Sequence, residues 1–113
     1  MVERTVLSQL VVELRRGTQI ILVLSQLKAM RYGYSLLRSL EEKGVQIEAG
    51  TLYPLLRRLE SQGILESEWD TTESRPRKYY VLSAEGHGVY EALIEEWKAI
   101  SKEMSDLLEE DLK

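Results

Sequence analysis

The stretch that decides the fold is RYGYSLLRSLEEKGVQIEAGTLYPLLRRLESQGIL, residues 31–65. Its first half predicts a short helix with an apolar face, and Gly44 follows it as glycine commonly follows a helix C-terminus. Its second half predicts a helix over residues 48–62, ended by Gly63, because leucines recur there at helical spacing. The leucines of the two faces are Leu36, Leu37, Leu40, Leu52, Leu55, Leu56 and Leu59. Two helices joined by a tight turn that contains glycine predict a helix-turn-helix.

A β-hairpin is expected directly after these two helices. Residues 64–69 and 77–82 are rich in aromatic and β-branched side chains, and the polar loop 70–76 separates them. A hairpin in this position forms the wing of a winged helix-turn-helix. The predicted fold class is therefore mainly α with a small β-hairpin.

Further helices are expected on both sides of this unit. Upstream, apolar residues at four-residue spacing predict a helix over 2–14, which Gly17 interrupts, and Thr18 can cap a second helix that reaches Met30. That second helix is apolar on most of its circumference, so one of its sides is expected to meet another subunit. Downstream, Ser83 can cap a long helix that runs to about Leu108.

The last helix carries apolar residues at alternating spacings of three and four, the seam of a helix that pairs with another helix. We therefore divide the chain into an N-terminal helix with a winged helix-turn-helix at 1–82, and a C-terminal dimerisation helix with an acidic tail at 83–113. The expected dimer interface consists of Leu24, Tyr90, Leu93, Trp97, Ile100, Met104 and Leu107.

The composition argues against several classes of function. The chain has no cysteine and a single histidine, His87, and it has neither a P-loop nor a glycine-rich dinucleotide motif. We therefore expect no enzyme activity, no metal site and no cofactor. No secretion signal or membrane-spanning stretch is recognised, so a cytoplasmic protein without a membrane partner is expected.

Charge is distributed unevenly along the chain. The net charge of −4 divides into +2 over residues 1–82 and −6 over residues 83–113. The electrostatic field that a nucleic acid meets is local to the binding face, so the acidic tail is expected to point away from DNA.

The helix over 48–62 is expected to lie in the major groove, with its N-terminal residues at the base edges. The side chains outside its leucine stripe that we expect to contact DNA are Glu48, Gly50, Thr51, Tyr53 and Arg57, of which Arg57 is a phosphate contact. Two alternatives stay open: Thr51 could only cap the helix, and Tyr53 could be half-buried packing.

The hairpin and the first helix of the pair add candidate phosphate contacts. The wing has the densest basic cluster of the chain, with a tyrosine beside it: Arg75, Arg77, Lys78 and Tyr79. A solvated hairpin whose charges only aid solubility is the alternative. Tyr34 and Arg38 begin the helix that crosses the sugar-phosphate backbone, whereas core packing explains Tyr32 better.

Four segments together resemble the PadR family of bacterial transcriptional regulators. They are ELRRGT (13–18), RYGYSLLRSLEE (31–42), EAGTLYPLLRRLESQGIL (48–65) and RKYYVLSAEG (77–86), and the likeness covers roughly residues 13–108. The single C-terminal helix is similar to that of the small PadR subclass. The resemblance implies a homodimer in which this helix packs against the partner's first helix. It also implies a repressor that leaves its double-stranded, pseudo-palindromic operator when it binds an effector.

The resemblance also points to Trp97. Some small members of the family stack planar aromatic compounds between paired tryptophans at the dimer centre, and Trp97 falls at the equivalent place. The expected ligand site consists of Ile20, Val23, Leu93, Trp97 and Ser101. Glu96 could balance a cationic ligand or simply be solvated, and Trp97 could only pack in the seam. The apolar extension 1–12 could add to the dimer or fill the cavity.

Two alternatives to an effector-responsive repressor remain open. The acidic tail and the low isoelectric point, about 5.1, are compatible with a winged helix used as a protein-interaction module. A repressor without any small-molecule effector is the other.

Overall fold

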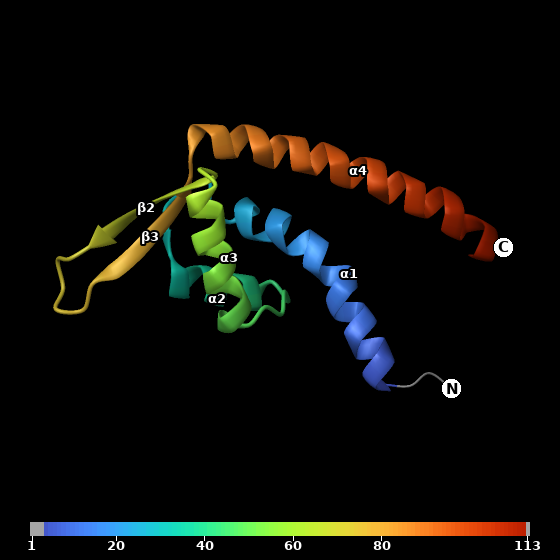
Figure 1. The fold of residues 1–113 in the computed structure, drawn as a ribbon, viewed down its shortest axis with the longest axis horizontal. Helices are drawn as coiled ribbons and strands as arrows, with labels where there is room; N and C mark the ends of the chain where they lie inside the picture. Colours follow the sequence, from blue (N-terminus) through green and yellow to red (C-terminus); the bar gives the residue numbers. More distant parts are fainter. Residues whose placement is uncertain (1–3, 113) are drawn as a thin grey trace.

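The computed structural model describes residues 4–112, so residue 2, where the first predicted helix begins, lies outside the described residues. Its elements are α1 (Arg4–Ser25), β1 (Arg31–Tyr32), α2 (Gly33–Glu42), α3 (Ala49–Ser61), β2 (Leu65–Asp70), β3 (Arg77–Leu82) and α4 (Ala84–Leu112). The predicted winged helix-turn-helix is confirmed: α2 and α3 are followed by the β2–β3 hairpin (Figure 1). None of the helices over these residues combines the length and apolarity that a membrane span requires.

The sheet has three antiparallel strands in the order β1-β3-β2. The hairpin pairs Leu65 with Leu82 at its base and Asp70 with Arg77 at its open end, while β1 pairs Tyr32 with Tyr79. The sequence predicted the hairpin but not β1. A strand of two residues is too short to show an alternating pattern, and β1 becomes a strand only because β3 lies beside it.

A leucine-rich core joins α1 to the winged unit. Its completely buried members are Val23, Leu24, Leu27, Leu36, Leu52 and Leu56. The backbone closes around them where the Leu82 amide donates to the Leu27 carbonyl at 2.9 Å. Leu24 and Val23 thus belong to the chain's own core, which corrects their assignment to a dimer interface and a ligand site. When a helix is apolar on most of its circumference, its sequence does not distinguish the side that packs in its own domain from the side that meets another subunit.

Helix α1 is continuous through Gly17, contrary to the predicted break. A glycine inside a helix costs about 1 kcal/mol relative to alanine, which weakens a helix but does not by itself end it. The Thr18 hydroxyl donates to the Arg15 carbonyl at 2.9 Å inside the helix and caps nothing. The helix ends at Ser25 rather than Met30, because the chain turns there toward β1.

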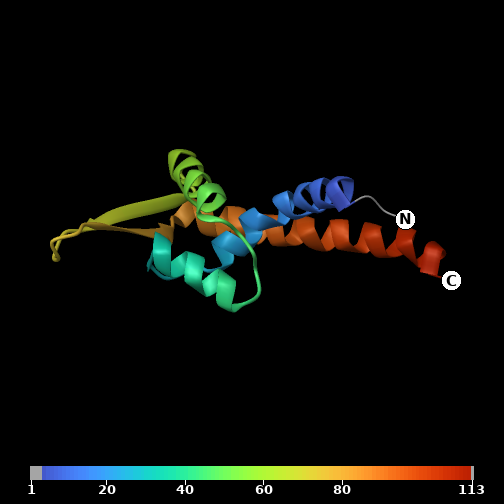
Figure 2. The ribbon, with the colours of Figure 1, turned by 90° about the horizontal axis from the view of Figure 1, so that it is seen from below.

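Ser83 caps α4 as predicted, and the helix extends past Leu108 to Leu112. The Gly86 amide donates to the Ser83 hydroxyl at 2.9 Å, which is the hydrogen bond of an N-cap. The molecule is elongated, 59 × 32 × 23 Å. Figure 2 shows why: the wing projects at one end, and α1 and α4 run from the core toward the other.

Candidate nucleic-acid interface and apolar pocket

The first turn of α3 is open to solvent. Glu48, Gly50 and Thr51 are exposed, and a Cβ added at Gly50 would meet no atom within 4 Å. Glu48 is the N-cap residue and its side chain forms no capping hydrogen bond, while Thr51 already lies inside the helix. Thr51 therefore does not cap α3, and the turn leaves room for a duplex to approach.

Tyr53 packs across the start of α2. A Cβ at Gly33 would come within 2.7 Å of the Tyr53 Cε1 atom, so the ring occupies the space that a side chain at Gly33 would need. The half-buried packing considered for Tyr53 is what the structure has, and it joins α2 to α3. A contact between Tyr53 and DNA stays a prediction.

Tyr34 and Arg38 form a small exposed unit on the first turns of α2. Tyr34 is 63% exposed, and its hydroxyl accepts a hydrogen bond from Arg38 Nη1 at 3.1 Å. This hydrogen bond raises the pKa of Arg38, so the guanidinium is charged at any ordinary pH. The pair offers one cation and one hydroxyl to an approaching phosphate.

The cations of the wing are largely engaged within the chain. Arg77 forms an ion pair with Glu73, and Lys78 Nζ lies 2.9 Å from Glu60 Oε1 on α3. Arg75, by contrast, forms no ion pair among residues 4–112 as described. The wing therefore presents less free positive charge than its sequence indicates.

Glu60 links α3 to the wing through two partners. Besides the ion pair with Lys78, its carboxylate accepts a hydrogen bond from the Ser67 hydroxyl on β2. Both partners lower the pKa of Glu60, the Ser67 hydroxyl most, so the carboxylate is ionised. Glu60 thus fixes α3 to both strands of the hairpin.

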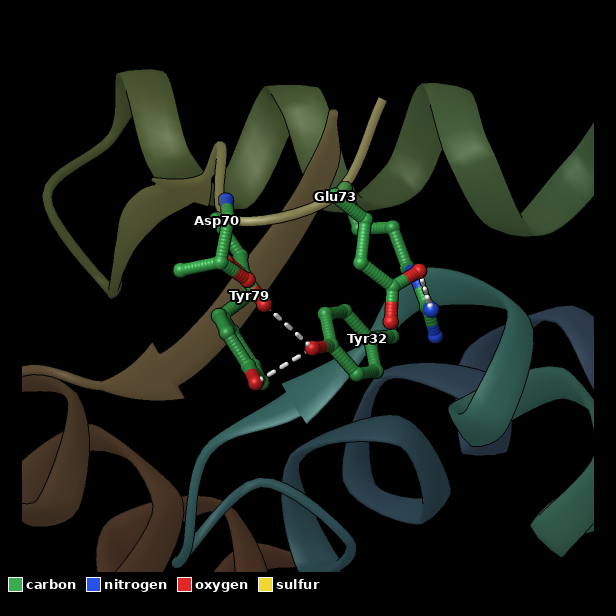
Figure 3. Close-up of polar contacts among 6 residues, drawn as sticks. Tyr32, Asp70, Glu73 and Tyr79 are labelled. Atoms are coloured by element: carbon green, nitrogen blue, oxygen red, sulfur yellow. Dashed lines mark hydrogen bonds and ion pairs between the residues drawn. The ribbon is translucent and has the colours of Figure 1, made fainter. Parts of the chain in front are cut away.

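Tyr79 is partly buried, and its side chain is engaged within the chain. Its hydroxyl donates to the Tyr32 hydroxyl, which in turn donates to Asp70 Oδ2 at 2.7 Å (Figure 3). This series of hydrogen bonds could not be predicted from the sequence, because Tyr32 and Tyr79 lie 47 positions apart. Tyr79 supports the wing in this structure and is not a free side chain on its surface.

Aromatic rings and arginines from α2, α3 and the wing line a concave surface that encloses a volume of about 530 Å³. Of the predicted contacts it brings together Tyr34, Tyr53, Arg57, Arg75, Arg77 and Lys78. Arg38, Glu48, Gly50, Thr51 and Tyr79 are not in its lining. Trp69, which is 62% exposed on β2, adds a ring to this surface that the sequence analysis did not select.

A second, mainly apolar pocket of about 450 Å³ lies between α1 and α4. Four of the five predicted ligand residues line it: Ile20, Leu93, Trp97 and Ser101. The fifth, Val23, is completely buried elsewhere. Glu96 is the one charged residue in the lining.

The same pocket includes residues that the predicted break in α1 concealed. Leu14, Gly17, Thr18 and Ile21 line it from one side of α1. Their spacing of three and four would have placed them on one face if the helix had been taken as continuous through Gly17.

Beyond this pocket, both helices expose apolar side chains. On α4, Trp97, Ile100 and Met104 are about half exposed and Leu107 is 70% exposed, while on α1 Leu14 is 69% exposed. Tyr90, in contrast, is buried in the chain's own core, which corrects its assignment to the dimer interface. Leu93 is partly buried against that core.

Comparison with known proteins identifies the chain's relatives. The model of the transcriptional regulator PadR-like family matches residues 20–92. A transcriptional regulator from Mycobacterium tuberculosis is 34% identical over 77 residues, which cover 68% of this chain and 69% of that protein.

Solved structures agree with this result. A PadR family transcriptional regulator from Eggerthella lenta is 51% identical, with a TM-score of 0.87 over 93% of this chain and 94% of the other. A PadR family regulator from Clostridium difficile is 34% identical, with a TM-score of 0.70 over 78% and 95% of the two chains. The chain therefore belongs to the PadR family of transcriptional regulators, which are DNA-binding proteins and not enzymes.

Proposed function

We propose that this chain is a homodimeric repressor that binds a pseudo-palindromic operator and leaves it when a planar aromatic compound occupies the pocket between α1 and α4. The observation that carries the proposal is that pocket: Trp97 stands in its lining, within the apolar surface that two subunits would share. Because the pocket is part of this shared surface, a bound compound would change how the two winged units are placed relative to each other.

The exposed faces of α1 and α4 support a dimer. Exposed valines and leucines follow one another along α1, as do tryptophan, isoleucine, methionine and leucine along α4, and monomeric proteins rarely expose such continuous apolar surface. A partner's helix would bury them and remove about 25 cal/mol of unfavourable free energy per Å² of apolar surface covered.

A dimer compensates for the small number of free cations on each wing, where Arg77 and Lys78 are held in ion pairs. Each subunit offers Arg57 and Arg75 together with the Tyr34–Arg38 pair, and a dimer doubles this number. Binding through phosphate contacts becomes steeply dependent on salt, with a slope of roughly −0.9 per phosphate neutralised. Two half-sites about 34 Å apart would then be read, which predicts a site with two-fold symmetry.

The lining of the pocket favours neutral or cationic aromatic effectors. Glu96 contributes a carboxylate and no lysine or arginine lines the pocket, so an anionic ligand would be repelled. Trp97 provides a face on which a planar ring can stack, and a cation near that ring is further stabilised.

Selection of bound sequences from random duplexes tests the DNA part of the proposal, with sedimentation of the free protein as the companion measurement. Enrichment of a two-fold symmetric site by a dimer is expected. A monomer, or no preference for any duplex at moderate salt, would contradict the proposal. If simultaneous charge reversal at Arg75, Arg77 and Lys78 left DNA binding unchanged, the wing would have no part in it, as in a protein-interaction module.

Fluorescence tests the effector part. The chain has two tryptophans, so Trp69→Phe leaves Trp97 as the only indole emitter. A planar cationic dye is expected to quench this emission and to release the operator, and Trp97→Ala is expected to abolish the release. Release that is absent, or that persists unchanged in Trp97→Ala, would favour a repressor without an effector at this site.

A further inference from the structure

Four side chains at the open end of the wing lie on one face of the sheet. Tyr32 pairs directly with Tyr79, and Asp70 pairs with Arg77, two residues before Tyr79 on the same strand. Because side chains alternate along a strand, residues 77 and 79 and their cross-strand partners share a face. The opposite face carries Lys78, which is bound to Glu60 on α3.

On this face the side chains form one connected unit. The Tyr32 and Tyr79 rings stack with centroids 4.0 Å apart and an interplanar angle of 23°. The Arg77 guanidinium lies 4.8 Å from the centroid of the Tyr32 ring. The hydroxyl groups run in series, from Tyr79 to Tyr32 to the carboxylate of Asp70.

Asp70 is the end of this series and also the start of the wing loop. Its other oxygen, Oδ1, accepts the Thr72 hydroxyl at 2.7 Å and the Thr72 amide at 3.0 Å. The Thr72 hydroxyl and amide, followed by the Tyr32 hydroxyl, lower the pKa of Asp70 to about 2, so the carboxylate is charged at any ordinary pH. Hydrogen bonds to an ionised acceptor are stronger than those between neutral groups.

Tyr32 connects two elements that are both expected to touch the DNA backbone. It is the N-cap residue of α2, directly before the turn that carries Tyr34, and its hydroxyl reaches Asp70 at the base of the wing loop. The residues are 38 positions apart in sequence. The orientation of the loop that carries Arg75 is thus tied to the start of α2.

We propose that Tyr32 is a positioning residue for DNA binding: its hydroxyl holds the wing loop, and with it Arg75, at a fixed orientation relative to α2. This inference rests on the proposed function, because it assumes that the wing meets the phosphate backbone. Tyr32 itself need not touch DNA. Its hydroxyl fixes the position of Arg75 before DNA binds.

Tyr32→Phe tests the proposal with little change elsewhere. Phenylalanine retains the ring that stacks on Tyr79 and removes only the hydroxyl between Tyr79 and Asp70. Tyr90→Phe is the matched control, since it removes a phenol hydroxyl from the core at α4, away from the wing. Both variants are expected to melt close to the wild-type protein.

Hydrogen exchange of the free protein is the first measurement. Loss of a hydrogen bond to a charged acceptor is expected to speed exchange of the Thr72 amide, which is bonded to Asp70, and of the strand amides at Asp70 and Arg77 about tenfold in Tyr32→Phe, and to leave Tyr90→Phe unchanged. Equal exchange of the wing in both variants would overturn the proposal whether or not the protein binds an operator.

A double-mutant cycle with Arg75→Gln is the second measurement, using the duplex obtained by selection. Arg75→Gln alone is expected to weaken binding and to flatten its salt dependence, and this loss is expected to shrink in the Tyr32→Phe background. Full additivity of the two substitutions would overturn the positioning role and leave the proposed function intact. A wild-type protein that binds no duplex would instead refute the proposed function, while the exchange experiment would still decide whether the hydroxyl holds the wing.

Discussion

Gly86→Ala should destabilise the protein strongly, because α4 begins in close contact with the backbone of residue 64. A Cβ at Gly86 would come 2.0 Å from the Ile64 carbonyl oxygen and 3.0 Å from its carbonyl carbon. Carbon and oxygen atoms normally approach no closer than about 3.3 Å. The start of α4 would therefore have to move by more than about 1 Å, since backbone cannot turn aside as a side chain can.

The movement would disrupt three hydrogen bonds at this point. The Ile64 carbonyl accepts the Ser83 amide at 3.0 Å, and the Ser83 hydroxyl donates to the Gly63 carbonyl at 2.7 Å and accepts the Gly86 amide at 2.9 Å. At about 1 kcal/mol for each of these bonds, the loss is about 3 kcal/mol. The helix propensity gained with alanine returns about 1 kcal/mol, so the expected net loss is about 2 kcal/mol.

Gly88→Ala provides a control in the same helix. A Cβ at Gly88 meets no atom within 4 Å, so alanine is expected to stabilise the protein by about 0.5–1 kcal/mol. Urea unfolding followed by far-ultraviolet circular dichroism, at one protein concentration for all variants, measures both effects. Equal midpoints for the two variants would refute the steric reasoning at Gly86.

Three other substitutions test the dimer and the DNA-binding surface. Glu73→Gln releases Arg77 from its ion pair and should raise duplex affinity by about two- to fivefold and steepen its salt dependence in a titration; weaker binding would contradict this. Ile100→Asp should give a folded monomer by sedimentation, because Ile100 is 53% exposed and lies outside the core, whereas a persisting dimer would exclude this part of α4 from the interface. Gly33→Ala should displace the Tyr53 ring and weaken operator binding severalfold with little change in dimerisation, and unaltered binding would show that the position of Tyr53 is unimportant.

The parts of the fold that follow local rules were predictable from the sequence. Three such features appear in the structure where they were expected: the leucine-spaced helix α3, the hairpin strand 77–82 and the Ser83 cap. Each of them depends on neighbours within a few residues. The course of the chain at Gly17 was predicted wrongly, because a single glycine costs a helix only about 1 kcal/mol and does not have to end it.

The candidate site was predictable in composition but not in arrangement. The family resemblance pointed to Trp97, Leu93 and Ser101 as ligand residues, and these three residues do line the pocket. The partners of the wing cations could not be read in the same way: Lys78 meets Glu60 from α3, 18 positions away, only after the sheet has folded against that helix. Charge counted along a sequence therefore overstates charge available to a ligand.

The position of β3 in the sheet constrains the order in which the protein can form during synthesis. β3 is the central strand, yet it is the last of the three to be made, so β1 and β2 have no partner until residues 77–82 exist. A growing chain that stops before β3 also lacks the Leu82 amide that joins the sheet to the Leu27 carbonyl. The winged unit therefore cannot close until this single six-residue strand is available to pair with both of its neighbours.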